Sequence, residues 1–177
     1  AMISSAGISR GSVKYLADTG RLDQVSRGVY TLPEVWEDEF VSIQERYKRG
    51  VFALDTALFL HDLTDRTPHK FHMAFPYGYN TSSPKAAGIL CSCKKEPYYS
   101  LGIALVDTPA GNTVRAYNAE KTLCEILKPI SHTDIQIITD AFKRYAGRKD
   151  KNIPLLSEYA HQLRVEKRLR PYLEVLL

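Results

Sequence analysis

Residues 7–33 read GISRGSVKYLADTGRLDQVSRGVYTLP, and they carry the clearest fold signal in this chain of 177 residues. Ser9 stands where a helix would begin, and serine caps a helix well because its oxygen accepts a hydrogen bond from a first-turn N–H group. Gly20 would end this helix, because glycine tolerates the left-handed backbone that is common at helix ends. Between them apolar residues recur at helical spacing, at Val13, Leu16 and Ala17. The stretch therefore predicts one short helix.

A β-hairpin is expected directly after this helix. Apolar residues flank the turn-forming pair Arg27-Gly28 on both sides, at Leu22, Val25, Val29 and Leu32. A short helix followed by a hairpin is the second half of a winged helix-turn-helix domain. Such a domain also needs a supporting helix in front, and residues 1–6 are too few to form it. The first helix of the domain is therefore missing from the residues given. Either the natural chain begins before Ala1, which we expect, or the domain is abbreviated.

The polar side of this helix and the tip of the hairpin supply candidate contacts to DNA. Gly11 would let the first helical turn approach a phosphate closely, and a helix N-terminus attracts anions. Hydroxyl groups and flat polar rings suit hydrogen bonds to phosphates and base edges. The candidate DNA-binding residues of this segment are Ser9, Arg10, Ser12, Lys14, Tyr15, Arg21 and Arg27. The alternative is that these side chains form an ordinary solvated helix surface.

The same stretch resembles the N-terminal domain of the AbiEi family, the antitoxins of type IV abortive-infection systems. The matching elements are Gly7-Ile8-Ser9-Arg10, Leu16, Gly20-Arg21-Leu22 and Arg27-Gly28-Val29-Tyr30-Thr31-Leu32-Pro33. A weaker resemblance continues through residues 53–58 and 117–123. In the second of these segments relatives read nearer to ERT…D, whereas this chain has Lys121 for the arginine and Glu125 for the aspartate. The charges are kept, but the two-pronged geometry of a guanidinium is lost.

The resemblance implies a two-domain protein with two activities. Residues 1–33 would bind an inverted-repeat operator in double-stranded DNA and repress the protein's own operon. Residues 34–177 would counter a nucleotidyltransferase-like toxin without forming a stable complex with it. The alternative is a plain winged-helix transcriptional regulator whose C-terminal domain senses a ligand or dimerises. No nucleophile elbow or phosphate-binding loop is present, so we expect no enzyme activity, and a nuclease is only the third hypothesis.

The composition is that of an ordinary globular protein. Hydrophobic residues make up 44% and charged residues 25% of the chain. No apolar run approaches the roughly 20 residues that a membrane-spanning helix needs. No signal peptide is visible, and the three cysteines argue against a disulfide framework. These observations predict a cytoplasmic protein that does not enter a membrane.

The formal net charge of +4 comes from the two ends of the chain. Residues 1–33 carry four Lys or Arg against two Asp, and residues 143–177 carry nine basic against four acidic groups. Residues 34–142 have a net charge of −3. A helix expected from Asp134 would turn Ile135, Ile138, Phe142 and Tyr145 inward and leave basic residues on its outer side. We therefore add Lys143, Arg144, Arg148 and Lys149 to the candidate DNA-binding residues.

After Pro33 the pattern predicts a mixed α/β domain with a helical C-terminal end, and an α+β fold class for the whole chain. A helix is expected from Asp38, and a second is expected to be capped by Asp55 or Thr56. Strands are expected at residues 70–75, 88–93, 101–106 and 113–117, with a loop at 76–84. Asn118 should cap the next helix, which Pro129 ends, and three more helices should follow between residue 134 and the C-terminus.

We expect neither a metal nor a cofactor. The densest group of potential metal ligands is His61, Asp62, Asp65, His69 and His72, and it has no spacing typical of a metal site. Cys91 and Cys93 would share one side of a strand, and Cys124 should pack in the core rather than act in redox chemistry.

Overall fold

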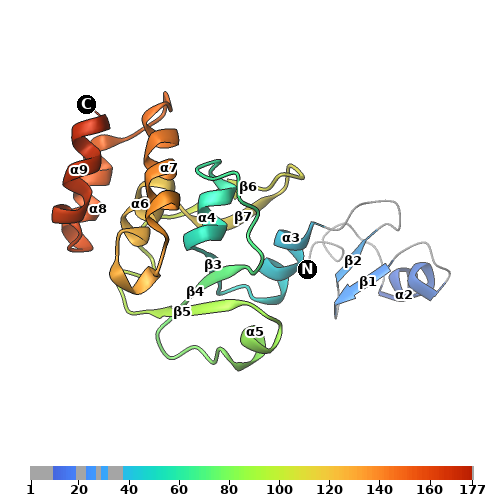
Figure 1. The fold of residues 1–177 in the computed structure, drawn as a ribbon. Coiled ribbons are helices and arrows are strands. Elements are labelled where there is room, and N and C mark those ends of the chain that lie inside the picture. The colour runs from blue at the N-terminus through green and yellow to red at the C-terminus, as the bar shows by residue number, and fades with distance from the viewer. Residues whose placement is uncertain (1–9, 19–22, 27–28, 32–37, 177) are drawn as a thin grey trace. The chain divides into compact units, whose positions relative to one another are not determined.

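The structure is a computed structural model that describes residues 10–18, 23–26, 29–31 and 38–176 (Figure 1). The chain divides into two compact units, Ala1–Arg46 and Tyr47–Leu177. The domain boundary expected at Pro33 lies outside the described residues.

The first unit contains the predicted helix and the predicted hairpin. Helix α2 spans Arg10–Asp18, and strands β1 (Asp23–Ser26) and β2 (Val29–Thr31) pair in antiparallel fashion. Helix α3 (Glu39–Arg46) follows in the same unit, and the side chain of Asp38 accepts a hydrogen bond from the N–H of Phe40 at its start. The helix and the hairpin are thus confirmed, whereas their assembly into a winged helix-turn-helix domain stays a prediction.

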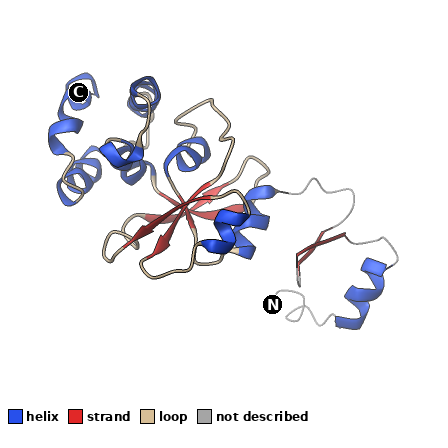
Figure 2. Ribbon diagram, turned by 60° about the horizontal axis from the view of Figure 1, so that its bottom comes forward, coloured by secondary structure: helices blue, strands red, loops and turns tan. Residues whose placement is uncertain are grey.

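The second unit is built on a five-stranded mixed sheet with the strand order β5-β4-β3-β7-β6 (Figure 2). Its strands are β3 (Val51–Phe52), β4 (His72–Pro76), β5 (Leu90–Lys94), β6 (Ile103–Asp107) and β7 (Thr113–Tyr117). The pairs β3–β7 and β4–β5 are parallel, and β3–β4 and β6–β7 are antiparallel. Strands β5 and β6 form the two edges of the sheet. The four strands expected from the sequence are therefore confirmed within two residues.

The central strand β3 was not expected from the sequence, because two residues give no readable alternation. In the sequence of its neighbour β4, apolar and polar residues alternate from Lys70 to His72 and place Met73 and Phe75 on one side, a pattern typical of a half-buried strand. The structure instead buries Met73, Ala74 and Phe75 together, because β4 lies inside the sheet between β5 and β3. A strand in that position buries both of its faces when other elements cover the sheet.

Helices surround this sheet and form the C-terminal end of the unit, where α7, α8 and α9 lie together (Figure 1). Their bounds are α4 Leu54–Leu60, α5 Ser82–Ala86, α6 Ala119–Ile126, α7 Ile135–Ala146, α8 Ile153–Gln162 and α9 Glu166–Leu176, with a 3-10 turn at Pro129–Ser131. A large apolar core joins α6 to α7, α8 and α9 through Leu123, Ile126, Phe142, Leu156 and Leu169. The predicted helical end is confirmed.

Helix starts show where sequence reasoning succeeded and where it failed. The side chain of Asn118 accepts from the N–H of Lys121 at 3.0 Å and that of Asp134 from Gln136 at 2.7 Å, so both predicted caps are present. The cap expected at Asp55 or Thr56 is wrong, because α4 begins at Leu54. Thr56 is buried instead, and its hydroxyl accepts a hydrogen bond from the N–H of His72 at 2.8 Å.

Two further expectations need correction. The loop expected at 76–84 contains the start of α5. Ile135, expected to face inward, is 64% exposed, because it is the first residue of α7 and the core begins one turn later at Ile138. Within the described part of the chain, no helix is both long and apolar enough to cross a membrane.

Candidate functional site

The predicted DNA-reading helix exposes two of the side chains that the structure describes, Tyr15 and Asp18. In α2, Val13 is buried and Tyr15 is 67% exposed. Residues two positions apart on a helix point about 200° apart, so Tyr15 is on the side opposite the buried valine. Ser9, Arg21 and Arg27, and the side chains of Arg10, Ser12 and Lys14, lie outside what the structure describes.

The predicted basic surface at the end of α7 separates into bound and exposed side chains. Arg148 donates from Nη1 to the carbonyl oxygen of His61 at 2.7 Å and forms a two-pronged pair with Asp150 at 2.9 and 2.6 Å. This pair raises the pKa of Arg148 and lowers that of Asp150 to about 2. Arg144 lies 3.3 Å from a carboxylate oxygen of Asp65.

Lys143 and Lys149 lie on either side of these arginines and are exposed. Neither lysine forms an ion pair within the part of the chain that the structure describes. The four predicted residues are therefore near one another in sequence but not equivalent, because Arg148 holds the end of α4 to the segment after α7.

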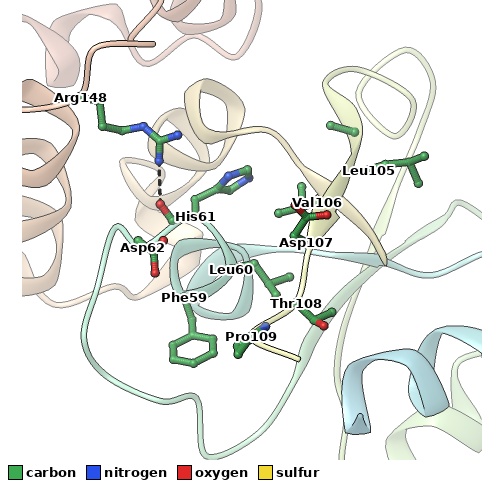
Figure 3. Close-up of a pocket in the computed structure, with 11 residues that line it drawn as sticks. Phe59, Leu60, His61, Asp62, Leu105, Val106, Asp107, Thr108, Pro109 and Arg148 are labelled. Carbon is green, nitrogen blue, oxygen red and sulfur yellow. Dashed lines mark hydrogen bonds between the residues drawn. The ribbon is translucent and has the colours of Figure 1, made fainter. Parts of the chain in front are cut away.

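A pocket of about 490 Å³ lies beside this arginine (Figure 3). One wall is the C-terminal end of α4, residues 59–62, and the other is edge strand β6 with the turn that follows it, residues 104–109. Arg148 closes one end, and its bond to the carbonyl oxygen of His61 is visible in the close-up. The volume is within the range typical of small-ligand sites.

The lining of this pocket includes a neutral imidazole. Nε2 of His61 lies 2.7 Å from the carbonyl oxygen of Tyr117. A carbonyl oxygen only accepts, so Nε2 carries the proton. Burial lowers the pKa of His61, more than the bond to Tyr117 raises it, and the ring is neutral at pH 7. The pocket thus offers an imidazole and the carboxylates of Asp62 and Asp107.

A cluster of buried charges, which sequence reasoning did not identify as a site, lies between α6 and the sheet. Lys121 is fully buried, and its ammonium donates to the carbonyl oxygens of Tyr98 at 2.5 Å and Leu101 at 2.7 Å. The same nitrogen lies 3.3 Å from the ring centre of Tyr117 and 3.8 Å from Glu125.

Glu125 also pairs with Lys94 from strand β5. Burial lowers the pKa of Lys121 to about 7, against the opposing effect of Glu125. The sequence signal for this cluster was a Lys and a Glu four residues apart within a helix whose other residues are mostly apolar, at 119–127.

The potential metal ligands stay apart, and the cysteines are not paired. In the described ranges, no three His, Cys, Asp or Glu side chains are grouped so as to hold a metal ion. Cys91 and Cys93 lie on β5 as free thiols. Cys124 is buried on α6, where burial raises its pKa to about 12, and its predicted place in the core is confirmed.

The second unit therefore belongs to the class of mixed α/β domains with a helical end, and it carries a pocket at one sheet edge and a buried charge cluster.

Residues 1–33 match the sequence model of a protein family described as "Transcriptional regulator, AbiEi antitoxin". The crystal structure of the RV2827C protein from Mycobacterium tuberculosis has a similar fold, with a TM-score of 0.52 and 15% sequence identity, over 97% of this chain and 72% of that one. A search of curated protein sequences finds no match.

The buried ammonium of Lys121 yields a stability prediction. Replacement by Met should lower the free energy of unfolding at neutral pH by about 3 to 5 kcal/mol, because it leaves two carbonyl oxygens without their donor and removes one of the two cations beside the buried Glu125. Lys128→Met is the matched control, since that side chain lies just after the same helix but is only half-buried, and it should cost less. Urea unfolding followed by circular dichroism measures both.

The same variant also tests the protonation of Lys121. The unfolded chain holds this proton up to a pKa near 10.5 and the folded chain releases it near 7, so between these values the unfolded state binds more protons. The contribution of Lys121 to stability should therefore rise with pH over this window. The difference between parent and Lys121→Met should grow from pH 7 to pH 9, and a constant or shrinking difference would show that the amine stays charged.

Proposed function

We propose that this protein is a DNA-binding transcriptional regulator and an antitoxin of a type IV abortive-infection system, and that it represses its own operon. The observation that carries the proposal is the match of residues 1–33 to the AbiEi regulator family, in the segment where helix α2 is followed by a hairpin. This order of elements is that of the DNA-reading half of a winged helix-turn-helix.

In this proposal α2 lies in the major groove of an inverted-repeat operator. Arg10, Ser12, Lys14 and Tyr15 contact bases and phosphates from the helix, and the exposed ring of Tyr15 supports this role. Ser9 caps the helix. Arg27 contacts the DNA backbone from the turn of the hairpin, and Arg21 contacts it from the residues before the hairpin. Lys143, Arg144 and Lys149 add phosphate contacts beside the operator, whereas Arg148 serves the structure of the second unit.

The second unit would supply the antitoxin activity without catalysis of its own, in the cytoplasm. It would counter a nucleotidyltransferase-like toxin without forming a stable complex with it. The compact core of residues 47–177 supports a separate role for this unit, since it includes a sheet and five helices of seven or more residues.

The pocket beside His61 favours one second candidate function, a regulator whose C-terminal unit senses a small ligand. The pocket lies within the second unit and combines polar groups with apolar walls from Phe59, Leu60 and Val106. In that case the ligand would alter operator affinity, and no toxin would be involved.

Operator binding by α2 is tested with Arg10→Ala combined with Lys14→Ala. In the proposal both side chains face DNA and not the core, so the thermal melt should change little. Affinity for a duplex carrying the protein's own promoter should fall strongly, and the slope of log K against log salt should decrease by about 0.9 for each phosphate that is no longer neutralised. A gel-shift titration measures both quantities.

The matched control is Arg66→Ala combined with Lys70→Ala, which removes the same charge from exposed positions of the second unit. It should bind the promoter as the parent does. An equal decrease of affinity in both double variants would mean that net charge, and not α2, determines the affinity.

The basic end of α7 is tested with Lys143→Glu combined with Lys149→Glu. These two lysines are exposed and Arg148 is left intact, so the fold should not be disturbed. Affinity should drop for promoter and random duplex alike, with a weaker salt dependence and an unchanged preferred sequence. Parent-like binding of both duplexes at low salt would show that this surface does not touch DNA.

The antitoxin role is tested by co-expression with the protein encoded in the adjacent reading frame. If that protein arrests growth, the full chain should restore growth, and a fragment of residues 47–177 should restore at least part of it while failing to bind the promoter. A folded fragment that gives no rescue, beside an active full chain, would show that both units are needed. A harmless neighbour would favour the ligand-sensing regulator.

A further inference from the structure

Two exposed tyrosines with lysines beside their rings lie near the ends of strands β4 and β5. Tyr77 directly follows β4 and is 70% exposed, and Nζ of Lys95 lies 4.8 Å from its ring centre. Tyr98 is 40% exposed, and Nζ of Lys128 lies 5.9 Å from its ring centre. We call these four residues together with Lys94 the tyrosine–lysine patch.

The two strands are parallel and end side by side, which places Tyr77 next to the segment that leaves β5 (Figure 1). Pro76 pairs with Lys94 at the end of the ladder, and the N–H of Tyr77 donates to the carbonyl oxygen of Lys94 at 2.8 Å. Tyr98 is held through its backbone, since its carbonyl oxygen accepts from the buried ammonium of Lys121 at 2.5 Å. Hydrogen bonds therefore fix the backbone of both tyrosines.

The patch carries more positive than negative charge, and of the two nearby carboxylates that of Glu96 is exposed. Lys94, Lys95 and Lys128 bring three ammonium groups. Of the nearby carboxylates, Glu125 is buried and paired with Lys94, and Glu96 accepts hydrogen bonds from the N–H and hydroxyl of Ser100 at 3.2 and 2.6 Å. A ligand that approaches the patch thus meets more cations than carboxylates, together with two aromatic rings.

Unpaired polar groups lie under the same edge of the sheet. The Oε2 atom of Glu125 and the hydroxyl of Ser92 are buried and have no hydrogen-bond partner among the described residues. Ser92 is two residues before Lys94 on β5, and therefore on the same face of the strand. Native proteins rarely bury such groups without a partner, and an ordered water or ion is one partner that they commonly have.

We propose that the tyrosine–lysine patch binds single-stranded nucleic acid, separately from the duplex-binding surface proposed for α2. Bases stack on the open faces of Tyr77 and Tyr98, and the lysines contact the intervening phosphates. Every base has a stacking face, so recognition is tolerant of sequence, as in other single-strand sites that combine aromatic rings with a basic surface. A lysine on one face of a ring leaves the other face for a base and adds a cation–π contribution.

The test measures fluorescence anisotropy of fluorescein-labelled oligo(dT) and oligo(U) twelve-mers with the full chain at low salt. The parent should bind at least one of them, and comparison of the two shows whether DNA or RNA is preferred. Tyr77→Ala and Tyr98→Ala should each weaken binding roughly five- to a hundredfold, the range that corresponds to the removal of one stacked base. Lys95→Ala should lower the salt slope by about 0.7, the value for one phosphate of a single strand.

The conservative variants Tyr77→Phe and Tyr98→Phe keep the rings and should bind as the parent does, which guards against an effect on folding. Tyr15→Ala separates the two nucleic-acid sites, because it should weaken the promoter duplex and leave the oligonucleotides unaffected. Absence of binding by the parent, or parent-like binding by the combined Tyr77→Ala and Tyr98→Ala variant, would overturn the proposal. Either result would leave the proposed duplex binding by α2 standing.

Discussion

The buried ammonium of Lys121 is the interaction on which the second unit depends. It is fully buried on α6, and it donates to the carbonyl oxygens of Tyr98 and Leu101 in the segment between β5 and β6. A charge in this position is costly to desolvate and is tolerated only where several acceptors surround it. Tyr117 and Glu125 complete that environment from the sheet and from the helix itself.

This network explains the local backbone around it. Gly102 has a φ of +68°, and a Cβ atom there would approach Asn118 Oδ1 at 3.0 Å and Lys121 Cβ at 3.1 Å. Glycine is the residue that adopts this positive φ readily, and it has no Cβ atom that would need space here. The N–H of Asn118 donates to the carbonyl oxygen of Gly102 at 2.7 Å, so the start of α6 and the start of β6 are joined directly. The edge strand that lines the pocket and the loop that presents Tyr98 are therefore positioned by one helix.

The sequence patterns of this chain predicted its local structure. They did not predict contacts between residues that are far apart in the sequence. The helix and hairpin at the N-terminus, the cap at Asn118 and four strands follow from spacing and turn chemistry. Strand β3 could not be predicted from its two residues, because its place at the centre of the sheet comes from pairing with β4 and β7. The burial of Lys121 was hidden for the same reason, since its acceptors are 20 and 23 positions away in sequence.

The basic residues of the C-terminal segment show most clearly what cannot be predicted from composition. The nine basic residues of the C-terminal segment suggested a broad anion-binding surface. The fold instead uses Arg148 to join its own segment to His61 and to pair with Asp150, and it sets Arg144 beside Asp65. An arginine whose donors are already engaged contributes less to a nucleic-acid interface than an exposed lysine, because it must first give up those bonds. The lysines near Tyr77 and Tyr98 lie in the segment whose net charge is negative, and composition alone gives no sign of them. The distribution of exposed cations over the surface, which folding determines, is therefore a better basis than composition for proposing a polyanion-binding surface.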